Sequence, residues 1–168
     1  MRLEMNFNWN EILKDYKANP NLKADEVILL LLKFGNVSGR IMLQNQVFIA
    51  YKEILKDNVS DLLFHPDQYG PYSRLITDAI AKLKFEGKIK IIPNYQFPHP
   101  TYYNITEYGK EYIYQIIREK RINDIIIKKL QEKKKDWDEW ATDGIIQYVY
   151  RNYPEYATKT KVPRLKWE

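Results

Sequence analysis

Residues 69–73 read Tyr-Gly-Pro-Tyr-Ser, and residues 74–86 continue as Arg-Leu-Ile-Thr-Asp-Ala-Ile-Ala-Lys-Leu-Lys-Phe-Glu. This stretch predicts an amphipathic helix from Ser73 to Glu86, because its apolar residues recur at helical spacing and form one stripe. The stripe consists of Leu75, Ile76, Ala79, Ile80 and Leu83. Ser73 is placed to cap the first turn, and Gly87 stands where a residue in the left-handed conformation commonly ends a helix.

A β-hairpin and a further helix are predicted directly after this helix. Residues 88–93 alternate in the manner of a strand, residues 94–100 form a polar loop, and the chain returns through residues 101–105. Thr106 then stands at a helix N-cap, with Glu107 close to the positive end of the helix dipole. A helix, a hairpin and a returning helix in this order predict a mostly α-helical winged helix-turn-helix with a small β-hairpin. Such scaffolds are commonly set against nucleic acid.

Length and composition limit the classes of protein that are open to this chain. With 168 residues, 45% of them hydrophobic, it is long enough for one domain with a buried core and an extension. The absence of cysteine excludes a disulfide framework, a thiolate metal site and a cysteine nucleophile. No stretch approaches the ~20 apolar residues of a membrane span, and the N-terminus lacks the pattern of a secretory signal. We therefore expect a soluble, cytoplasmic protein without a membrane partner.

Positive charge is concentrated in the middle of the chain. The net charge is +5, yet residues 1–72 (8 basic, 9 acidic) and residues 136–168 (5 basic, 6 acidic) each carry a net −1. Residues 73–90 hold 5 basic and 2 acidic groups, and residues 107–135 hold 9 and 5. A positive surplus on the helices before and after the hairpin is expected of a surface that faces a polyanion. The alternative for residues 107–135 is an ordinary solvated, lysine-rich helix.

Helices are predicted on both sides of the winged-helix core. An apolar stripe before the break at residues 19–21 predicts a helical arm over residues 1–20. This stripe consists of Trp9, Ile12, Leu13 and Tyr16. Residues 24–34 are predicted as the central and most buried helix, since residues 27–32 are apolar without interruption. The predicted organisation is an N-terminal arm (1–20), a winged-helix domain (21–121) and a C-terminal helical extension (122–168) that offers a dimer or partner surface.

Several local predictions complete the organisation. Ser38 is placed to cap the helix that follows it, Leu62–Phe64 is predicted as a short strand that pairs with the hairpin, and His65–Asp67 as a turn. Asn123 is placed to cap a helix in the C-terminal extension. The aromatic region from Trp137 to Tyr156 is interpreted as core packing or a dimer seam rather than a ligand cage. The residues from 157 to 168 are interpreted as a tail.

Three motifs carry a resemblance to a known group. Residues 39–48 read Gly-Arg-Ile-Met-Leu-Gln-Asn-Gln-Val-Phe, residues 69–73 Tyr-Gly-Pro-Tyr-Ser, and residues 148–156 Tyr-Val-Tyr-Arg-Asn-Tyr-Pro-Glu-Tyr. In this order they resemble the motifs of YwgA-like proteins, a winged-helix group related to the phage-associated Panacea antitoxin domain, although Asn45 departs from the group's usual lysine. The resemblance implies a winged-helix fold and, by analogy, a regulatory or antitoxin-like role. Residues 73–109 are also similar to the helix-wing-helix half of archaeal and bacterial winged-helix repressors.

The predicted recognition helix and wing supply candidate contacts to DNA. The helix would lie in a major groove, and the wing near Asn94 to Pro100 would reach the adjacent backbone. Arg40, at the start of the preceding helix, can bind phosphate through its charge and the helix N-terminus together. Asp78 on the same face opposes binding, because a carboxylate repels phosphate, and the connection over residues 56–68 is unusually long. The candidate DNA-binding residues are Arg40, Ser73, Arg74, Thr77, Lys82, Lys88, Lys90, Tyr95 and Gln96.

The same motifs allow other interpretations. The Tyr-Gly-Pro-Tyr motif favours a structural role, in which Gly70 permits a positive φ and Pro71 opens the helix; the alternative is a partner-binding or phosphate-contacting edge. Asp67 followed by Glu86 and Lys88 matches a metal-nuclease spacing, but Glu86 ends a helix instead of alternating with Lys88 on a strand. The two histidines, at positions 65 and 99, are too few for a zinc site. We expect no catalytic residues, no metal and no cofactor.

The sequence therefore predicts a winged helix-turn-helix protein that binds double-stranded DNA as a homodimer, regulates transcription and has no enzyme activity. The alternative is a non-enzymatic protein-interaction module, antitoxin-like or an adaptor, that uses the same scaffold to hold a protein partner.

Overall fold

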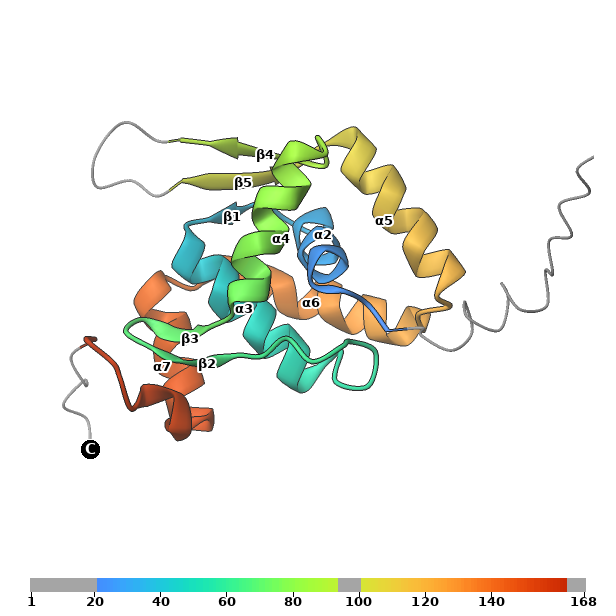
Figure 1. Cartoon of the computed structure of the whole chain (residues 1–168). Coiled ribbons are helices and arrows are strands. Elements are labelled where there is room, and N and C mark those ends of the chain that lie inside the picture. The colour runs from blue at the N-terminus through green and yellow to red at the C-terminus, as the bar shows by residue number, and fades with distance from the viewer. Residues whose placement is uncertain (1–20, 94–100, 163–168) are drawn as a thin grey trace, which may run out of the picture.

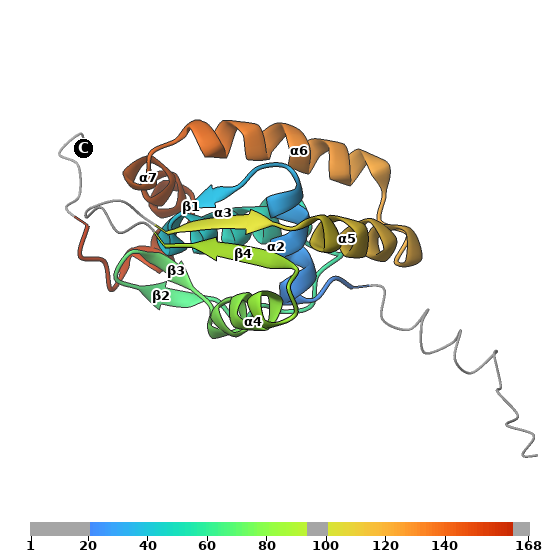
Figure 2. The same cartoon turned by 90° about the horizontal axis from the view of Figure 1, so that it is seen from above.

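The helix α2 (Ala24–Lys33) forms the centre of the protein in a computed structural model that describes residues 21–93 and 101–162. All six residues from Val27 to Leu32 are no more than 1% exposed, so the prediction of a central buried helix is confirmed. Helices lie around α2 on several sides (Figures 1 and 2). The predicted arm over residues 1–20 and the predicted loop over residues 94–100 lie outside the described residues, as do residues 163–168.

The elements that follow α2 have the order of a winged helix. They are β1 (Val37–Ser38), α3 (Arg40–Glu53), α4 (Arg74–Phe85), β4 (Ile89–Ile92), β5 (Tyr102–Ile105) and α5 (Glu107–Glu119), with a small inserted hairpin between α3 and α4. The three strands form an antiparallel sheet in the order β1-β5-β4, in which the hairpin strands β4 and β5 are joined to the short strand β1 (Figure 1). The fold is thus mostly helical with a small antiparallel sheet, and the predicted fold class is confirmed.

The hairpin has one face toward the core and one toward solvent. Paired residues on antiparallel strands share a face, and the pairs Ile89↔Ile105 and Ile91↔Tyr103 lie on the inner one. Ile89 and Tyr103 are buried there. The outer face carries the other two pairs, Lys90↔Asn104 and Ile92↔Tyr102.

The segment between α3 and α4 differs from its prediction. Residues His65–Asp67 are a strand, β2, that pairs with β3 (Gly70–Tyr72) as a separate two-stranded sheet; they are not a turn. Gly70, at φ 99°, adopts the left-handed region that permits the tight connection at residues 68 and 69. Leu62–Phe64 forms no strand, because the Leu62 carbonyl accepts a hydrogen bond from the Ser73 hydroxyl and Leu63 has a positive φ of 53°.

The predicted helix ends are partly confirmed. The Thr106 hydroxyl accepts the Gly109 N–H at 3.0 Å, and the Asn123 side chain accepts the Ile125 N–H at 2.8 Å, so both caps are confirmed. Gly87 ends the α4 segment with φ 72°, as predicted. Ser38 does not cap α3, whose N-cap is Gly39, and the Ser73 side chain does not cap α4 although Ser73 occupies the N-cap position. Pro71 does not open α4 either, since it lies in β3.

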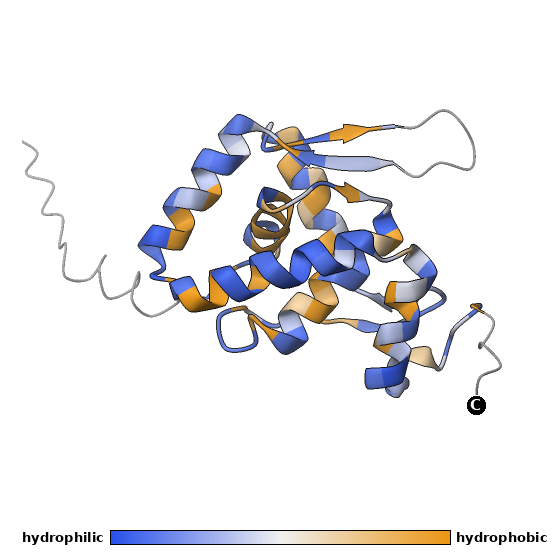
Figure 3. Ribbon diagram, turned by 180° about the vertical axis from the view of Figure 1, so that it is seen from behind, coloured by the Kyte–Doolittle hydropathy of each residue, from blue (hydrophilic) through white to orange (hydrophobic). Residues whose placement is uncertain are grey.

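The C-terminal helices belong to the same core. They are α6 (Asp124–Glu139), α7 (Thr142–Asn152) and the short 3₁₀ helix η1 (Pro154–Ala157). Their buried hydrophobic residues are Leu130, Trp137, Ile145, Ile146 and Val149, which lie in one cluster with the residues of α2 and α3, so the packing interpretation of this region is confirmed. Seen from behind, α6 crosses the molecule with a largely hydrophilic outer surface (Figure 3).

Aromatic rings and one carboxylate hold α7 and η1 against α3. The Phe48 ring packs edge-on against Tyr153 and Tyr156, with centroids 5.1 and 4.6 Å away. The Tyr148 hydroxyl donates to Glu53 Oε1 at 2.6 Å. Burial and the negative charge of Glu53 raise the pKa of Tyr148, and they raise the pKa of Tyr153 to about 12. Both phenols therefore stay protonated, as this contact requires, far above neutral pH.

Two glycines in helical first turns test the packing of the hairpin against α5. A Cβ on Gly109 would overlap with the backbone carbonyl oxygen of Lys88, whereas a Cβ on Gly144 in α7 would meet nothing closer than 3.8 Å. We expect Gly109→Ala to lower the free energy of unfolding by about 2 kcal/mol or more, because the backbone must shift. Gly144→Ala, the matched control, should raise it by about 0.5–1 kcal/mol through its better helix propensity. Urea unfolding measures both, and equal effects would contradict the close approach.

Candidate nucleic-acid interface

The helix α4 lies at the surface with its outer face uncovered by the described chain. Its inner stripe of Ile76, Ala79, Ile80 and Leu83 is buried, mainly against α2. The strands β2 and β3 precede the start of α4, and β4 follows its end (Figure 1). Seen from above, α4 and α6 occupy opposite sides of the molecule (Figure 2). In a winged helix, α4 holds the place of the recognition helix and β4–β5 that of the wing.

The start of α4 is fixed by a buried amide of α3. Gln44 Oε1 accepts the Ser73 N–H at 3.0 Å, and Gln44 Nε2 donates to the Ser73 carbonyl at 3.0 Å and to Thr77 Oγ1 at 3.3 Å. Ser73 is completely buried, so its prediction as a DNA contact is wrong. Thr77 is half-buried and shares a 2.8 Å hydrogen bond with the Tyr72 hydroxyl, which leaves it little freedom to reach a base.

The Tyr-Gly-Pro-Tyr motif, directly before α4, also fixes the start of this helix to the rest of the fold. The Gly70 N–H donates to the Tyr150 hydroxyl of α7 at 3.0 Å. A Cβ on Gly70 would come within 2.5 Å of the Asn45 Oδ1, so glycine is required for the close approach as well as for the positive φ. Asn45, completely buried, donates to the carbonyls of Ile41 at 2.8 Å and Tyr69 at 3.2 Å. Asn45 therefore ties α3 to the β2–β3 hairpin. The resembling group usually has lysine at this position.

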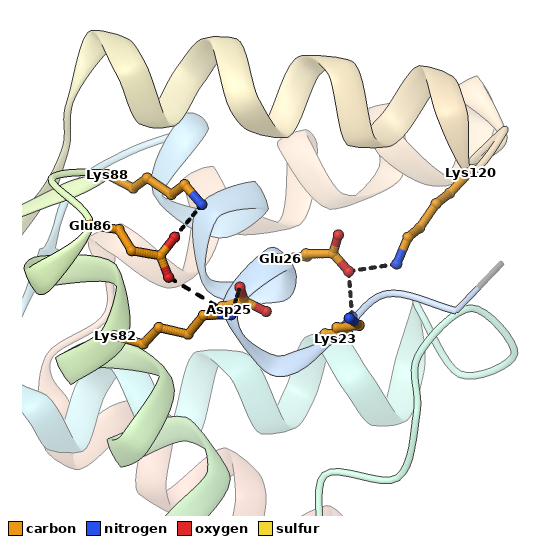
Figure 4. A network of polar contacts seen from close by, with 7 residues as sticks. All are labelled: Lys23, Asp25, Glu26, Lys82, Glu86, Lys88 and Lys120. Carbon is orange, nitrogen blue, oxygen red and sulfur yellow. Dashed lines mark hydrogen bonds and ion pairs between the residues drawn. The ribbon is translucent and has the colours of Figure 1, made fainter. Parts of the chain in front are cut away.

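The end of α4 joins a network of ion pairs (Figure 4). Lys82 Nζ lies 3.2 Å from Asp25 Oδ2 of α2 and 3.8 Å from Glu86 Oε1. Lys88 Nζ lies 2.5 Å from Glu86 Oε2, and 3.5 Å from the centre of the Tyr112 ring. Lys88 is only 5% exposed, so its prediction as a DNA contact is wrong. The physical reason is that its ammonium group is enclosed by a carboxylate and an aromatic ring.

The same network extends to the end of α5. Glu26 Oε1 accepts the Lys23 N–H at 2.8 Å and Lys120 Nζ at 2.6 Å, and Lys120 Nζ also donates to the Asn21 carbonyl at 2.8 Å (Figure 4). Asp25 and Glu26 are both nearly fully buried. Lys120 is thus removed from the positive surplus that the sequence assigns to residues 107–135.

The pKa values of Lys82 and Lys134 are shifted in opposite directions, although each lysine has an aspartate partner. The hydrogen bond to Asp25 raises the pKa of Lys82 above its ordinary value. Its contribution to stability is present below the ordinary lysine pKa and is lost as the pH rises through the raised value. Burial instead lowers the pKa of Lys134, which has no exposed surface and donates to Asp138 at 2.5 and 2.6 Å. Lys134 is therefore a second cation of the predicted basic surface that lies inside the protein.

Lys82 keeps 58% of its side chain exposed beside Asp25, and four further exposed cations lie around α4 and the sheet. They are Arg40, Arg74, Lys84 and Lys90. The Arg74 side chain is 86% exposed, and its Nε lies 3.9 Å from Asp78 Oδ2, a solvated pair that adds little to stability. Arg40 lies close enough to β5 for its charge to oppose the effect of burial on the pKa of Tyr103. Lys84 and Lys90 make no ion pair with the described residues. The predicted wing contacts, Tyr95 and Gln96, lie outside the described residues.

Exposed apolar side chains on α4 were missed by sequence reasoning. Phe85 is 93% exposed and Leu75 is 40% exposed, although the pattern places Leu75 in the buried stripe. A helical projection starting from Arg74 puts Asp78, Ala81 and Phe85 on the same outer face. That projection was the available signal for Phe85. The outer face of α4 is therefore half polar and half apolar, with one arginine and one aspartate at its start and a phenylalanine at its end.

The described residues form neither a metal site nor a nuclease site. They contain no group of three or more histidine, aspartate or glutamate side chains that could hold a metal ion. Asp67 lies in β2, while Glu86 and Lys88 pair with each other at the end of α4, so the nuclease spacing forms no shared site. None of their helices has the length and apolar character needed to cross a bilayer.

Comparisons with protein-family models, with curated proteins and with solved structures gave no match to this chain.

The two wing lysines give a direct test of this assignment. We expect Lys88→Ala to lower the free energy of unfolding by about 2 kcal/mol, because it removes an enclosed ammonium from Glu86 and Tyr112. Lys90→Ala, two residues further along the chain and exposed in β4, should change it by less than about 0.5 kcal/mol. Thermal and urea unfolding provide the measurement. A Lys88→Ala variant as stable as the parent would contradict the buried position of Lys88, and Lys88 would again be a candidate DNA contact.

Proposed function

We propose that this protein binds double-stranded DNA through the outer face of α4 and the adjoining wing and regulates transcription in the cytoplasm. One observation carries the proposal: α4 and the β4–β5 hairpin stand next to each other in winged-helix order, with exposed Arg74, Lys84 and Lys90 along them. In this proposal Arg40 adds a phosphate contact at the start of α3. The protein acts without enzyme activity, and as a homodimer that reads two half-sites about one helical turn apart.

The proposed interface is smaller than the sequence suggests. Ser73 and Lys88 are withdrawn into the fold, and Lys82 is held by Asp25. About four phosphate contacts from Arg40, Arg74, Lys84 and Lys90 remain. Such a set gives a salt dependence of about −3.6 in log K against log salt, and hence a loss of about a hundredfold between 50 and 200 mM salt. Asp78 reduces the attraction further, because its carboxylate faces the same side as Arg74.

The proposal is tested by duplex binding at several salt concentrations. We expect Arg74→Ala and Lys84→Ala each to weaken binding several-fold and to reduce the salt slope by about 1. Lys128→Ala is the matched control, since Lys128 is an exposed lysine on α6, on the side of the molecule opposite α4 (Figure 2). Fluorescence anisotropy with labelled duplex measures both quantities. Duplex binding that is absent at 50 mM salt, or equally weakened by Lys128→Ala, would contradict the proposed interface.

A protein-interaction module is the second candidate, and the exposed Phe85 is the observation that favours it. A phenylalanine that is 93% exposed has no use on a purely electrostatic DNA surface, whereas exposed aromatic residues are typical anchors of protein interfaces. The exposed Arg74–Asp78 pair is also compatible with the polar rim of a protein interface. The resemblance to YwgA-like proteins also supports an antitoxin-like partner, and this resemblance stays a prediction.

A single substitution separates the two candidates. Phe85→Ser removes the exposed ring at the end of α4 and should leave stability unchanged, because the side chain is almost fully solvated. For a protein-interaction module we expect loss of at least tenfold in affinity for the partner, with little dependence on salt. For a DNA-binding protein we expect duplex affinity to change less than twofold. Titrations of the variant with a duplex and with a purified candidate partner, such as a protein encoded next to this one, measure both.

A further inference from the structure

A shallow groove follows one flank of α4, beside the start of α2. Its volume is about 340 Å³. Three parts of the chain form it: the start of α2, the segment after the α3 helix, and α4 itself. Its lining residues are Lys23, Ala24, Asp25, Ser60, Asp61, Leu62, Leu75, Asp78, Ala79 and Lys82.

The floor of the groove is apolar and its rim is charged. Leu62 and Ala79 are buried beneath it, and Leu75 remains 40% exposed within it. The Asp25–Lys82 ion pair borders the groove on the side of α2, as Figure 4 shows for that pair. Asp61 and Asp78 supply two more carboxylates at the rim. An occupant must therefore bring an apolar stripe, and a cation beside that stripe would be favoured.

A strained leucine lies next to the floor. Leu63 has φ 53° and is 62% exposed, and its N–H donates to the Asp61 carboxylate at 2.9 Å. A branched residue in the left-handed region is uncommon and costs on the order of 1 kcal/mol. Strained residues cluster at functional sites, and Leu63 directly follows the buried Leu62 of the groove floor. This observation is independent of the groove itself.

The chain enters the fold at the wall of this groove. The Leu22 N–H donates to the Asn58 carbonyl at 2.6 Å, and the Ser60 N–H donates to the Leu22 carbonyl at 3.2 Å. Ser60 and Lys23 both line the groove. Residues 1–20, which lie outside the described residues, are thus joined to the fold at Asn21, next to the groove.

The sequence of residues 1–20 matches what the groove requires. Trp9, Ile12, Leu13 and Tyr16 are spaced for one face of a helix, and Lys17 projects next to Leu13 in the same projection. We propose that the groove beside α4 is the docking site of this N-terminal segment of the same chain. The five residue-to-residue steps from Tyr16 to Asn21 span at most about 18 Å. A tether of this length gives a millimolar effective concentration, so even a weak apolar contact is occupied.

Docking covers Leu75 and Asp78, on the flank of α4, and does not depend on DNA binding. It accounts for the exposed Leu75 by giving it a partner within the chain. It also explains why an apolar stripe precedes a domain whose described core is already complete.

Because the chain has no cysteine, introduced pairs can report the position of the segment in the full-length protein. Lys17→Cys with Asp78→Cys places one thiol beside the stripe and one at the groove rim. Lys17→Cys with Asp124→Cys is the matched control, since Asp124 is exposed near Lys120, which holds the Asn21 carbonyl, but lies off the groove. We expect mild oxidation to give an intramolecular disulfide at least tenfold faster in the first pair. Mass spectrometry and non-reducing gels measure the rate.

Adding Ile12→Asp and Leu13→Asp to the first pair should reduce its rate to that of the control, while circular dichroism shows the fold intact. Equal rates in the two pairs would overturn the proposal, as would a fast rate that ignores the added aspartates. A disulfide between chains would also overturn it, because the groove would then hold a second copy. Since the readout is a covalent bond within the protein, a failure of the proposed DNA binding leaves this test unaffected.

Discussion

Two buried carboxylates at the start of α2 constrain the arrangement of the helices around it. Asp25 and Glu26 lie in the first turn of the central helix, where the helix dipole favours negative charge, yet both are nearly withdrawn from water. A buried charge must be paired and hydrogen-bonded, or its desolvation outweighs the gain from packing. Asp25 forms an ion pair with Lys82 of α4, and Glu26 forms one with Lys120 at the end of α5. The two helices that flank the hairpin are therefore tied to α2 at defined points, in addition to their apolar contacts.

This pairing changes what the charge of the chain means for function. The basic surplus of residues 73–90 is a property of the sequence. The surface potential depends instead on which of those positive charges are exposed and are not paired with a carboxylate. Lys82 is compensated by Asp25, which lies outside that segment, and Lys88 is compensated by Glu86 beside it. What remains for a ligand is a sparse set of cations and an exposed phenylalanine. A sparse set can support phosphate contacts of moderate strength, whereas the phenylalanine is the better anchor for a protein. Arg74 and Phe85 share the outer face of α4.

The parts that local chemistry decides were predictable from the sequence. The apolar period located α2 and α4, and alternation located the hairpin. Side chains that act within three residues, such as the Thr106 and Asn123 caps, followed from position alone. The errors arose where a partner lies far along the chain. Ser73 looked like a local cap, but its backbone is held by Gln44, which lies 29 residues earlier.

The same limit explains the candidate site. Lys82 meets Asp25 across 57 residues, and no spacing rule connects them. His65–Asp67 was missed for a different reason, since its partner strand Gly70–Tyr72 is close in the sequence: its composition is turn-like, yet the left-handed Gly70 lets the two segments pair. Phe85, in contrast, could have been found, because a helical projection places it on the outer face of α4 with Arg74.

The inserted β2–β3 hairpin and the C-terminal extension together hold the start of α4 in place. A long connection between α3 and α4 would ordinarily leave the start of α4 poorly fixed. Here the connection is held at its turn, where the Gln68 carbonyl accepts the Lys161 N–H at 2.9 Å and the Gly70 N–H donates to Tyr150. Tyr150 and Lys161 belong to the C-terminal extension, and α7 itself packs against α3. The extension therefore supports the helix that would meet a ligand, because its contacts hold the hairpin from which α4 begins.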